Sequence, residues 1–110
     1  MRIISGKFKG HKLNIPKNFL IRPTTDRFKE SLFSIINSEK YSSNIDGKYF
    51  LDLCSGSGGI GIEAFSRGAK KVYMIDNNQD AINLINKNLS KIELNVELDK
   101  NLFIFKHDIT

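Results

Sequence analysis

Hydrophobic and polar residues follow one another along residues 48–110 in a pattern that predicts alternating strands and helices. Short apolar runs at 49–53, 72–75 and 102–105 are rich in aromatic and β-branched residues, which is typical of strands. Between them, residues 60–67 and 78–89 place their apolar side chains at helical spacing. This order predicts βαβ units with a parallel sheet, so the expected fold class is α/β.

Residues 1–47 follow a different pattern. Two short apolar and polar alternations, at 2–5 and 12–15, are separated by glycines, which predicts a β-hairpin or an extended arm. Residues 38–47 are polar and rich in turn formers. We therefore expect a basic appendage over residues 1–47 and the first half of a larger domain over residues 48–110.

A helix is predicted at 26–37, inside that appendage, after the possible N-cap residues Thr24 and Thr25. Residues 92–98 alternate strictly, which fits either an extra strand or the tail of the preceding helix, and the pattern does not separate the two. The expected apolar face of the helix at 26–37 consists of Phe28, Leu32, Ile35 and Ile36.

Charge adds a functional hint to this pattern. The chain has 110 residues, enough for one domain, and a formal net charge of +5. Residues 1–30 hold eight Lys and Arg against two acids, whereas residues 31–110 hold nine against ten. Such asymmetry is typical of an arm that contacts nucleic acid, but a solvated hairpin would look the same. The candidate RNA-contacting residues are Arg2, Lys7, Lys9, Lys12, Arg22 and Arg27.

Cysteine usage and hydropathy indicate the cellular compartment. One cysteine, Cys54, cannot form an internal disulfide or a cysteine-based zinc site, which indicates a reducing environment and no metal. Neither a signal peptide nor a transmembrane run is visible, so we expect a cytoplasmic protein. We interpret Cys54 as a small packing residue rather than a nucleophile, because no histidine lies near it in the sequence.

The candidate chemistry is concentrated in residues 52–61, which follow a predicted strand and open a predicted helix. The segment from Gly56 to Gly61 fits the pattern G-x-G-x-x-G, and Asp76 ends the next predicted strand. Glycines let the backbone approach a ligand, and a carboxylate at that strand end can accept both hydroxyls of a ribose. A glycine turn that merely allows close packing is the alternative, but it leaves Asp52 and Asp76 unexplained.

Asp52 separates two classes of adenosine-bearing cofactor. NAD places a pyrophosphate over this turn, and two like charges about 4 Å apart cost on the order of 4 kcal/mol even at an effective dielectric of about 20. S-adenosylmethionine instead carries a sulfonium and an ammonium group, which a carboxylate attracts. The pattern therefore favours S-adenosylmethionine, with an NAD-dependent enzyme as the disfavoured alternative.

Asp108 follows the third predicted strand and belongs to the same expected ligand-binding edge. Its carboxylate could accept a hydrogen bond from the adenine amine, with Ile109 against the ring. Aspartate is also simply common after strands, so the position alone supports both readings.

Three stretches of the chain, residues 1–6, 22–33 and 52–69, together resemble the bacterial 16S rRNA (guanine-N2)-methyltransferases. The resemblance implies a class I S-adenosylmethionine-dependent methyltransferase fold with a Rossmann-like parallel sheet, S-adenosylmethionine as methyl donor, and 16S rRNA of the small ribosomal subunit as partner. The motif match implies methionine-end contacts by Asp52, Gly56 and Gly58, a ribose contact by Asp76, an adenine contact by Asp108, and closure of the pocket by Arg22, Thr24 and Arg27.

The sequence departs from this family in one respect. The resemblance is to longer chains, in which a later strand ends in an Asn/Asp-Pro-Pro-Tyr/Phe motif that binds the target amine. No proline follows Pro23, so no catalytic residue of that kind is expected within residues 1–110. We therefore expect an inactive form truncated after the third strand; a non-catalytic nucleotide- or RNA-binding remnant is the alternative.

Overall fold

The computed structural model describes residues 1–15, 25–38, 44–53, 55–92 and 100–108. Its strands form a parallel sheet in the order β1-β2-β3, which confirms the expected α/β class. The undecided segment at 92–98 falls almost entirely outside the described residues. None of the described helices is long and apolar enough to cross a membrane. The elements are α1 (Asp26–Ile36), β1 (Tyr49–Leu53), α2 (Gly59–Ser66), β2 (Lys71–Asp76), α3 (Gln79–Lys91) and β3 (Leu102–Lys106).

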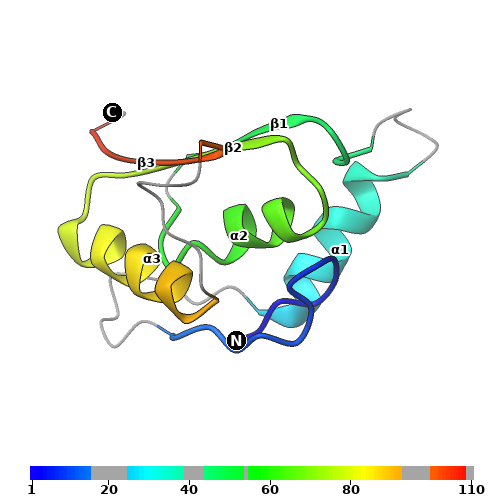
Figure 1. Ribbon diagram of the computed structural model, residues 1–110, viewed down its shortest axis with the longest axis horizontal. Coiled ribbons are helices and arrows are strands. Elements are labelled where there is room, and N and C mark those ends of the chain that lie inside the picture. Colours follow the sequence, from blue (N-terminus) through cyan, green and yellow to red (C-terminus); the bar gives the residue numbers. More distant parts are fainter. Residues whose placement is uncertain (16–24, 39–43, 54, 93–99, 109–110) are drawn as a thin grey trace.

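Both helices that connect the strands, α2 and α3, lie on the same side of the sheet (Figure 1). Strands that are added in chain order through right-handed crossovers place their connecting helices on one face. Val72, Met74 and Leu102 point to that face and are buried in the core. Large apolar side chains on the other face are exposed: Tyr49, Leu51, Leu53 and Phe105.

Helix α1 is present where it was predicted, but only half of its predicted apolar face is confirmed: Leu32 and Ile36 pack against the core, and Phe28 and Ile35 do not. Thr25 caps the helix by accepting a hydrogen bond from the Phe28 N–H at 3.1 Å. Phe28 and Ile35 are about half exposed, at 54% and 55%, whereas Lys29 and Phe33 are fully buried. The buried face is rotated from the apolar stripe because the ammonium group of Lys29 has a buried carboxylate partner, which apolar periodicity does not reveal.

Residues 1–15 form a hairpin-like loop, called here the N-terminal segment, that packs on α2 on the side away from the sheet (Figure 1). Arg2 and Lys12 form an antiparallel bridge, so the expected hairpin is present. Ile3 and Leu13 are buried in the same hydrophobic cluster as residues of the sheet and of α2. The boundary predicted after residue 47 stays a prediction, and this shared core shows that the N-terminal segment is not a free arm.

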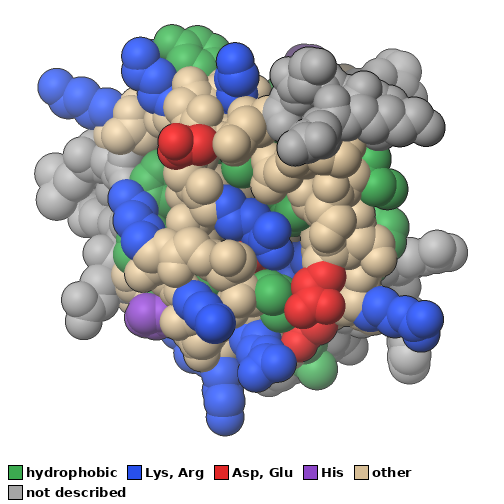
Figure 2. All heavy atoms as spheres, turned by 90° about the vertical axis from the view of Figure 1, so that its right-hand side faces the viewer, with side chains coloured by type: hydrophobic (Ala, Val, Ile, Leu, Met, Phe, Trp, Pro, Cys, Tyr) green, Lys and Arg blue, Asp and Glu red, His purple; other side chains and the backbone are tan. Residues whose placement is uncertain are grey.

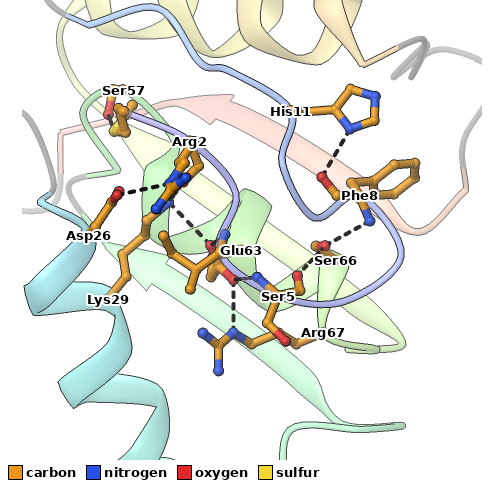
Figure 3. A network of polar contacts seen from close by, with 12 residues as sticks. Arg2, Ser5, Phe8, His11, Asp26, Lys29, Ser57, Glu63, Ser66 and Arg67 are labelled. Carbon is orange, nitrogen blue, oxygen red and sulfur yellow. Dashed lines mark hydrogen bonds and ion pairs between the residues drawn. The ribbon is translucent and has the colours of Figure 1, made fainter.

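Glu63 of α2 joins the N-terminal segment to the helices (Figure 3). Its side chain is fully buried, and its Oε1 accepts a hydrogen bond from the Ile4 N–H at 2.9 Å and lies 3.2 Å from Lys29 Nζ. Its Oε2 accepts from the Ser5 N–H at 3.1 Å and from Arg67 Nε at 2.8 Å. One carboxylate thus fixes three parts of the chain.

Gly6 and Gly10 provide a matched test of how closely the N-terminal segment packs. Both have φ of about +90°, but a Cβ at Gly6 would overlap the Ser66 carbonyl, whereas a Cβ at Gly10 meets nothing within 4 Å. Gly10→Ala should lower the free energy of unfolding by about 1 kcal/mol. Gly6→Ala should lower it by about 3 kcal/mol or more, because the backbone of Gly6 or of Ser66 must move to make room for the Cβ. Urea denaturation measures both, and equal losses would contradict the docked arrangement.

Candidate functional site

The glycine loop, residues 55–58, lies between the end of β1 and the start of α2. The Ser55 N–H donates to the Ile75 carbonyl at 3.0 Å, and the Gly58 N–H donates to the Ser55 carbonyl at 2.9 Å. Gly58 has φ of +81°, and a Cβ there would lie 3.1 Å from side-chain carbons of Ile62 and Ile85. The loop is therefore held tightly at the carboxyl edge of the sheet, where parallel α/β folds bind ligands.

Asp76 lies at the end of β2 and holds this loop in place. Its Oδ2 accepts a hydrogen bond from the Gly56 N–H at 2.9 Å, and its Oδ1 accepts from the Asn78 N–H at 2.9 Å. The His107 N–H donates to the Asp76 carbonyl at 2.9 Å, which brings the end of β3 to the same edge. Each carboxylate oxygen has a second lone pair, so these bonds leave acceptor capacity for a ligand hydroxyl.

Asp52 of β1 has a buried Oδ2 atom without a hydrogen-bond partner in the described part of the chain. Burial raises the pKa of Asp52 from 3.8 to about 6; hydrogen bonds with Gly61 and Ser55 oppose the rise, and the nearby Asp76 adds to it. Buried polar atoms are nearly always paired in folded proteins. A carboxylate oxygen left unpaired beside a glycine loop fits a ligand that brings an ammonium group, as S-adenosylmethionine does.

The remaining predicted cofactor residues are placed only in part. Asp108 is exposed and comes directly after His107, at the same edge of the sheet. Within the described ranges, no group of His, Cys, Asp and Glu side chains could hold a metal ion. The residues that fall outside the described part of the chain are Arg22, Thr24, Cys54 and Ile109.

The basic candidates of the N-terminal segment differ in their surroundings. Arg2 pairs with Asp26 at 3.1 Å, and the ammonium of Lys7 lies 4.9 Å from the centre of the Phe65 ring. Three further basic side chains, those of Lys9, Lys12 and Arg27, are exposed.

A hollow of about 570 Å³ lies between the N-terminal segment and α1, and its charged lining consists of Arg2, Lys9, Glu30 and Arg67. Figure 2 shows lysine and arginine side chains spread over the side of the molecule that includes α1 and the N-terminal segment, with a few acidic side chains among them. Arg67 follows the last turn of α2, whereas the glycine loop precedes its first turn. The eight residues of α2 therefore separate Arg67 from the glycine loop by about 12 Å along the helix.

Four buried polar or charged residues were missed by the sequence reasoning: Lys29, Ser57, Glu63 and Asn88. Two of them could have been recognised from the sequence. Glu63 interrupts a run of apolar and small residues in a helix without a polar face, and Asn88 stands on the apolar face of the predicted helix at 78–89. Polar residues at such positions are buried and paired, which identifies them as structural joints.

The model of a protein family described as "Conserved hypothetical protein 95" matches residues 1–107. The chain belongs to this family. Among its relatives, the Bacillus subtilis protein YlbH, a provisionally named rRNA methyltransferase, is 40% identical over 108 residues. Ribosomal RNA small subunit methyltransferase D of Escherichia coli is 36% identical over 93 residues. These alignments cover 98% and 84% of this chain but 54% and 44% of the relatives.

Solved structures support the same family and fold. A provisionally named methyltransferase of Escherichia coli, yhhF, superposes with a TM-score of 0.75 at 30% identity, covering 98% of this chain and 52% of that one. The C-terminal domain of precorrin-6Y C5,15-methyltransferase from Rhodobacter capsulatus, at 17% identity and a TM-score of 0.62, shares the fold; 80% of this chain and 42% of that one are covered. The chain thus has the class I methyltransferase fold. It spans about half the length of these relatives.

The raised pKa of Asp52 gives a test that needs no ligand. Because the folded chain binds this proton more tightly than the unfolded chain, the free energy of unfolding should fall as the pH rises from about 4 to 6. Asp52→Asn removes this penalty, so at pH 7 the variant should be more stable by on the order of 2 kcal/mol. Near pH 3 the two proteins should be equally stable. Urea denaturation at both pH values measures the difference. A variant that is less stable than the unaltered chain at pH 7 would contradict the inference that the buried Asp52 carboxylate lowers stability.

Proposed function

We propose that this chain is the S-adenosylmethionine-binding part of a methyltransferase that modifies the exocyclic N2 amine of a guanine in 16S rRNA. The main support for this cofactor is the buried Oδ2 of Asp52 beside a glycine loop, which has no hydrogen-bond partner among the described residues. The relatives named as small-subunit rRNA methyltransferases support the RNA substrate, and the resemblance in residues 1–6, 22–33 and 52–69 supports guanine N2. The cytoplasm remains the proposed location.

The proposed roles follow the carboxyl edge of the sheet. S-adenosylmethionine supplies an electrophilic methyl group on a sulfonium. Asp52 would hold its ammonium group, while Gly56 and Gly58 would let the backbone approach the methionine end. Asp76 would accept the ribose hydroxyls with the lone pairs that the loop does not use. The residues proposed to complete the adenine end and close the pocket are Asp108, Ile109 and Thr24; no catalytic residue is assigned within residues 1–110.

The proposed RNA surface is the face formed by the N-terminal segment and α1. Its basic residues would neutralise phosphates, which supplies affinity without base specificity. The side chains proposed for these contacts are Arg2, Lys7, Lys9, Lys12, Arg22 and Arg27.

Calorimetry with S-adenosylhomocysteine and with NAD tests the cofactor. We expect binding of S-adenosylhomocysteine and no measurable heat with NAD. Asp76→Asn should weaken the binding by about 1 to 3 kcal/mol, because charge-assisted hydrogen bonds to the ribose are lost. The control is Asp80→Asn, an exposed aspartate in the first turn of α3, which should bind as the unaltered chain does. Tighter binding of NAD than of S-adenosylhomocysteine would refute the assignment.

Salt dependence tests the RNA surface. Replacing both Lys9 and Lys12 with Gln should weaken binding to 16S rRNA and reduce the slope of log affinity against log salt by about 1 to 2, because fewer counterions are released. Replacing Lys70 and Lys100, which are exposed and belong to neither the N-terminal segment nor α1, should leave the slope unchanged. Filter binding from low to moderate salt measures both slopes. Equal slopes in the two double variants would favour the alternative, in which the N-terminal segment is a solvated hairpin that does not contact RNA.

A further inference from the structure

Asn88 of α3 joins the N-terminal segment to the glycine loop. Its side chain is fully buried, and its Oδ1 accepts a hydrogen bond from the Asn14 N–H at 2.6 Å. Its Nδ2 donates to the Asn14 carbonyl at 3.3 Å and to the Ser57 carbonyl at 3.0 Å. All three bonds end on backbone groups, so one side chain fixes the main chain of two segments that are far apart in the sequence.

The same loop residue is also held from the other arm of the N-terminal segment. Ser57 is almost completely buried, and its hydroxyl donates to the sulfur of Met1 at 3.7 Å. The Leu13 N–H donates to the Met1 carbonyl at 2.8 Å, which ties the two arms together. Ser57 lies between Gly56 and Gly58 in the glycine loop. The start of the N-terminal segment, at Met1, and its end, at Asn14 through Asn88, therefore both hold the backbone that the proposed cofactor approaches.

We propose that Asn88 is a positioning residue that couples the N-terminal segment to the glycine loop. The coupling rests on the proposed function, in which RNA contacts the segment and S-adenosylmethionine contacts the loop. If either segment moves away, its backbone groups and the buried Asn88 amide lose these partners, at a cost in free energy. Asn14 is also held by Lys91 of α3, whose Nζ donates to the Asn14 Oδ1 at 3.0 Å, so a second contact of α3 fixes the same arm. A ligand that orders one segment therefore favours the ordered form of the other.

Amide hydrogen exchange tests the joint without any ligand. Asn88→Leu removes all three bonds at similar volume, and the exposed Asn86→Leu on the same helix is the matched control. The Asn14 and Gly58 amides should exchange at least about tenfold faster in the first variant, relative to the Val72 amide inside the sheet. A merely stabilising side chain would speed all three amides together, and that result would overturn the proposal.

A second variant keeps the test decisive if Asn88→Leu does not fold. Asn88→Asp retains the oxygen that accepts from the Asn14 N–H but loses the donations to the Asn14 and Ser57 carbonyls. We expect the Gly58 amide to lose protection while the Asn14 amide keeps it. Unchanged protection of Gly58 would show that the loop does not depend on Asn88.

The affinity for S-adenosylhomocysteine, measured with and without saturating 16S rRNA, tests the linkage. The unaltered chain and Asn86→Leu should bind about fivefold or more tightly when RNA is present, a typical size for coupling between two sites. In Asn88→Asp this ratio should fall toward one. A ratio of one in the unaltered chain would overturn the coupling. Failure to bind S-adenosylhomocysteine at all would instead refute the proposed function, and the exchange result would still decide whether Asn88 joins the segments.

Discussion

The arrangement of the whole chain depends on one buried carboxylate, that of Glu63. An unpaired charge in this position would cost several kcal/mol, so α2 can bury it only when its partners are present. Those partners come from three places: backbone N–H groups of the N-terminal segment, Lys29 of α1, and Arg67 at the end of α2 itself. Lys29 also donates to the Arg2 carbonyl, which closes the cluster. The N-terminal segment and α1 are therefore integral parts of the folded unit (Figure 3).

This constraint makes α2 the central layer of the molecule. The sheet lies on one side of it and the N-terminal segment on the other, so nearly all of its residues are buried (Figure 1). Contact with the sheet is close: a Cβ at Gly61 would lie 2.6 Å from atoms of Met74. The glycine loop precedes α2 and Arg67 follows it, and the N-terminal segment reaches the loop directly through Met1 and Ser57. The outer face of the sheet remains apolar and exposed in the described residues, although parallel sheets are usually covered on both faces.

Local patterns predicted the local structure well, since strands, helices, the Thr25 cap and the glycine loop each depend on neighbouring residues. The same patterns were only partly right for α1, where Phe28 and Ile35 of the predicted apolar face are exposed and Lys29 is buried instead. Its partner Glu63 lies far along the sequence, and no periodicity records a pairing at that distance. The docking of the N-terminal segment was missed for the same reason, because it depends on hydrogen bonds between Ile4 and Glu63 and between Asn14 and Asn88.

Two acids on opposite sides of α2 show how structural and functional burial differ. Glu63 is fully buried, and both of its oxygens are paired with cations and backbone donors. Asp52 is less buried, yet one of its oxygens has no partner among the described residues, and burial raises its pKa to about 6. The first arrangement stabilises the fold; the second costs stability that the fold does not recover. A carboxylate that a protein holds at such a cost, at the edge where α/β sheets bind ligands, supports the proposed contact between Asp52 and a positively charged ligand group.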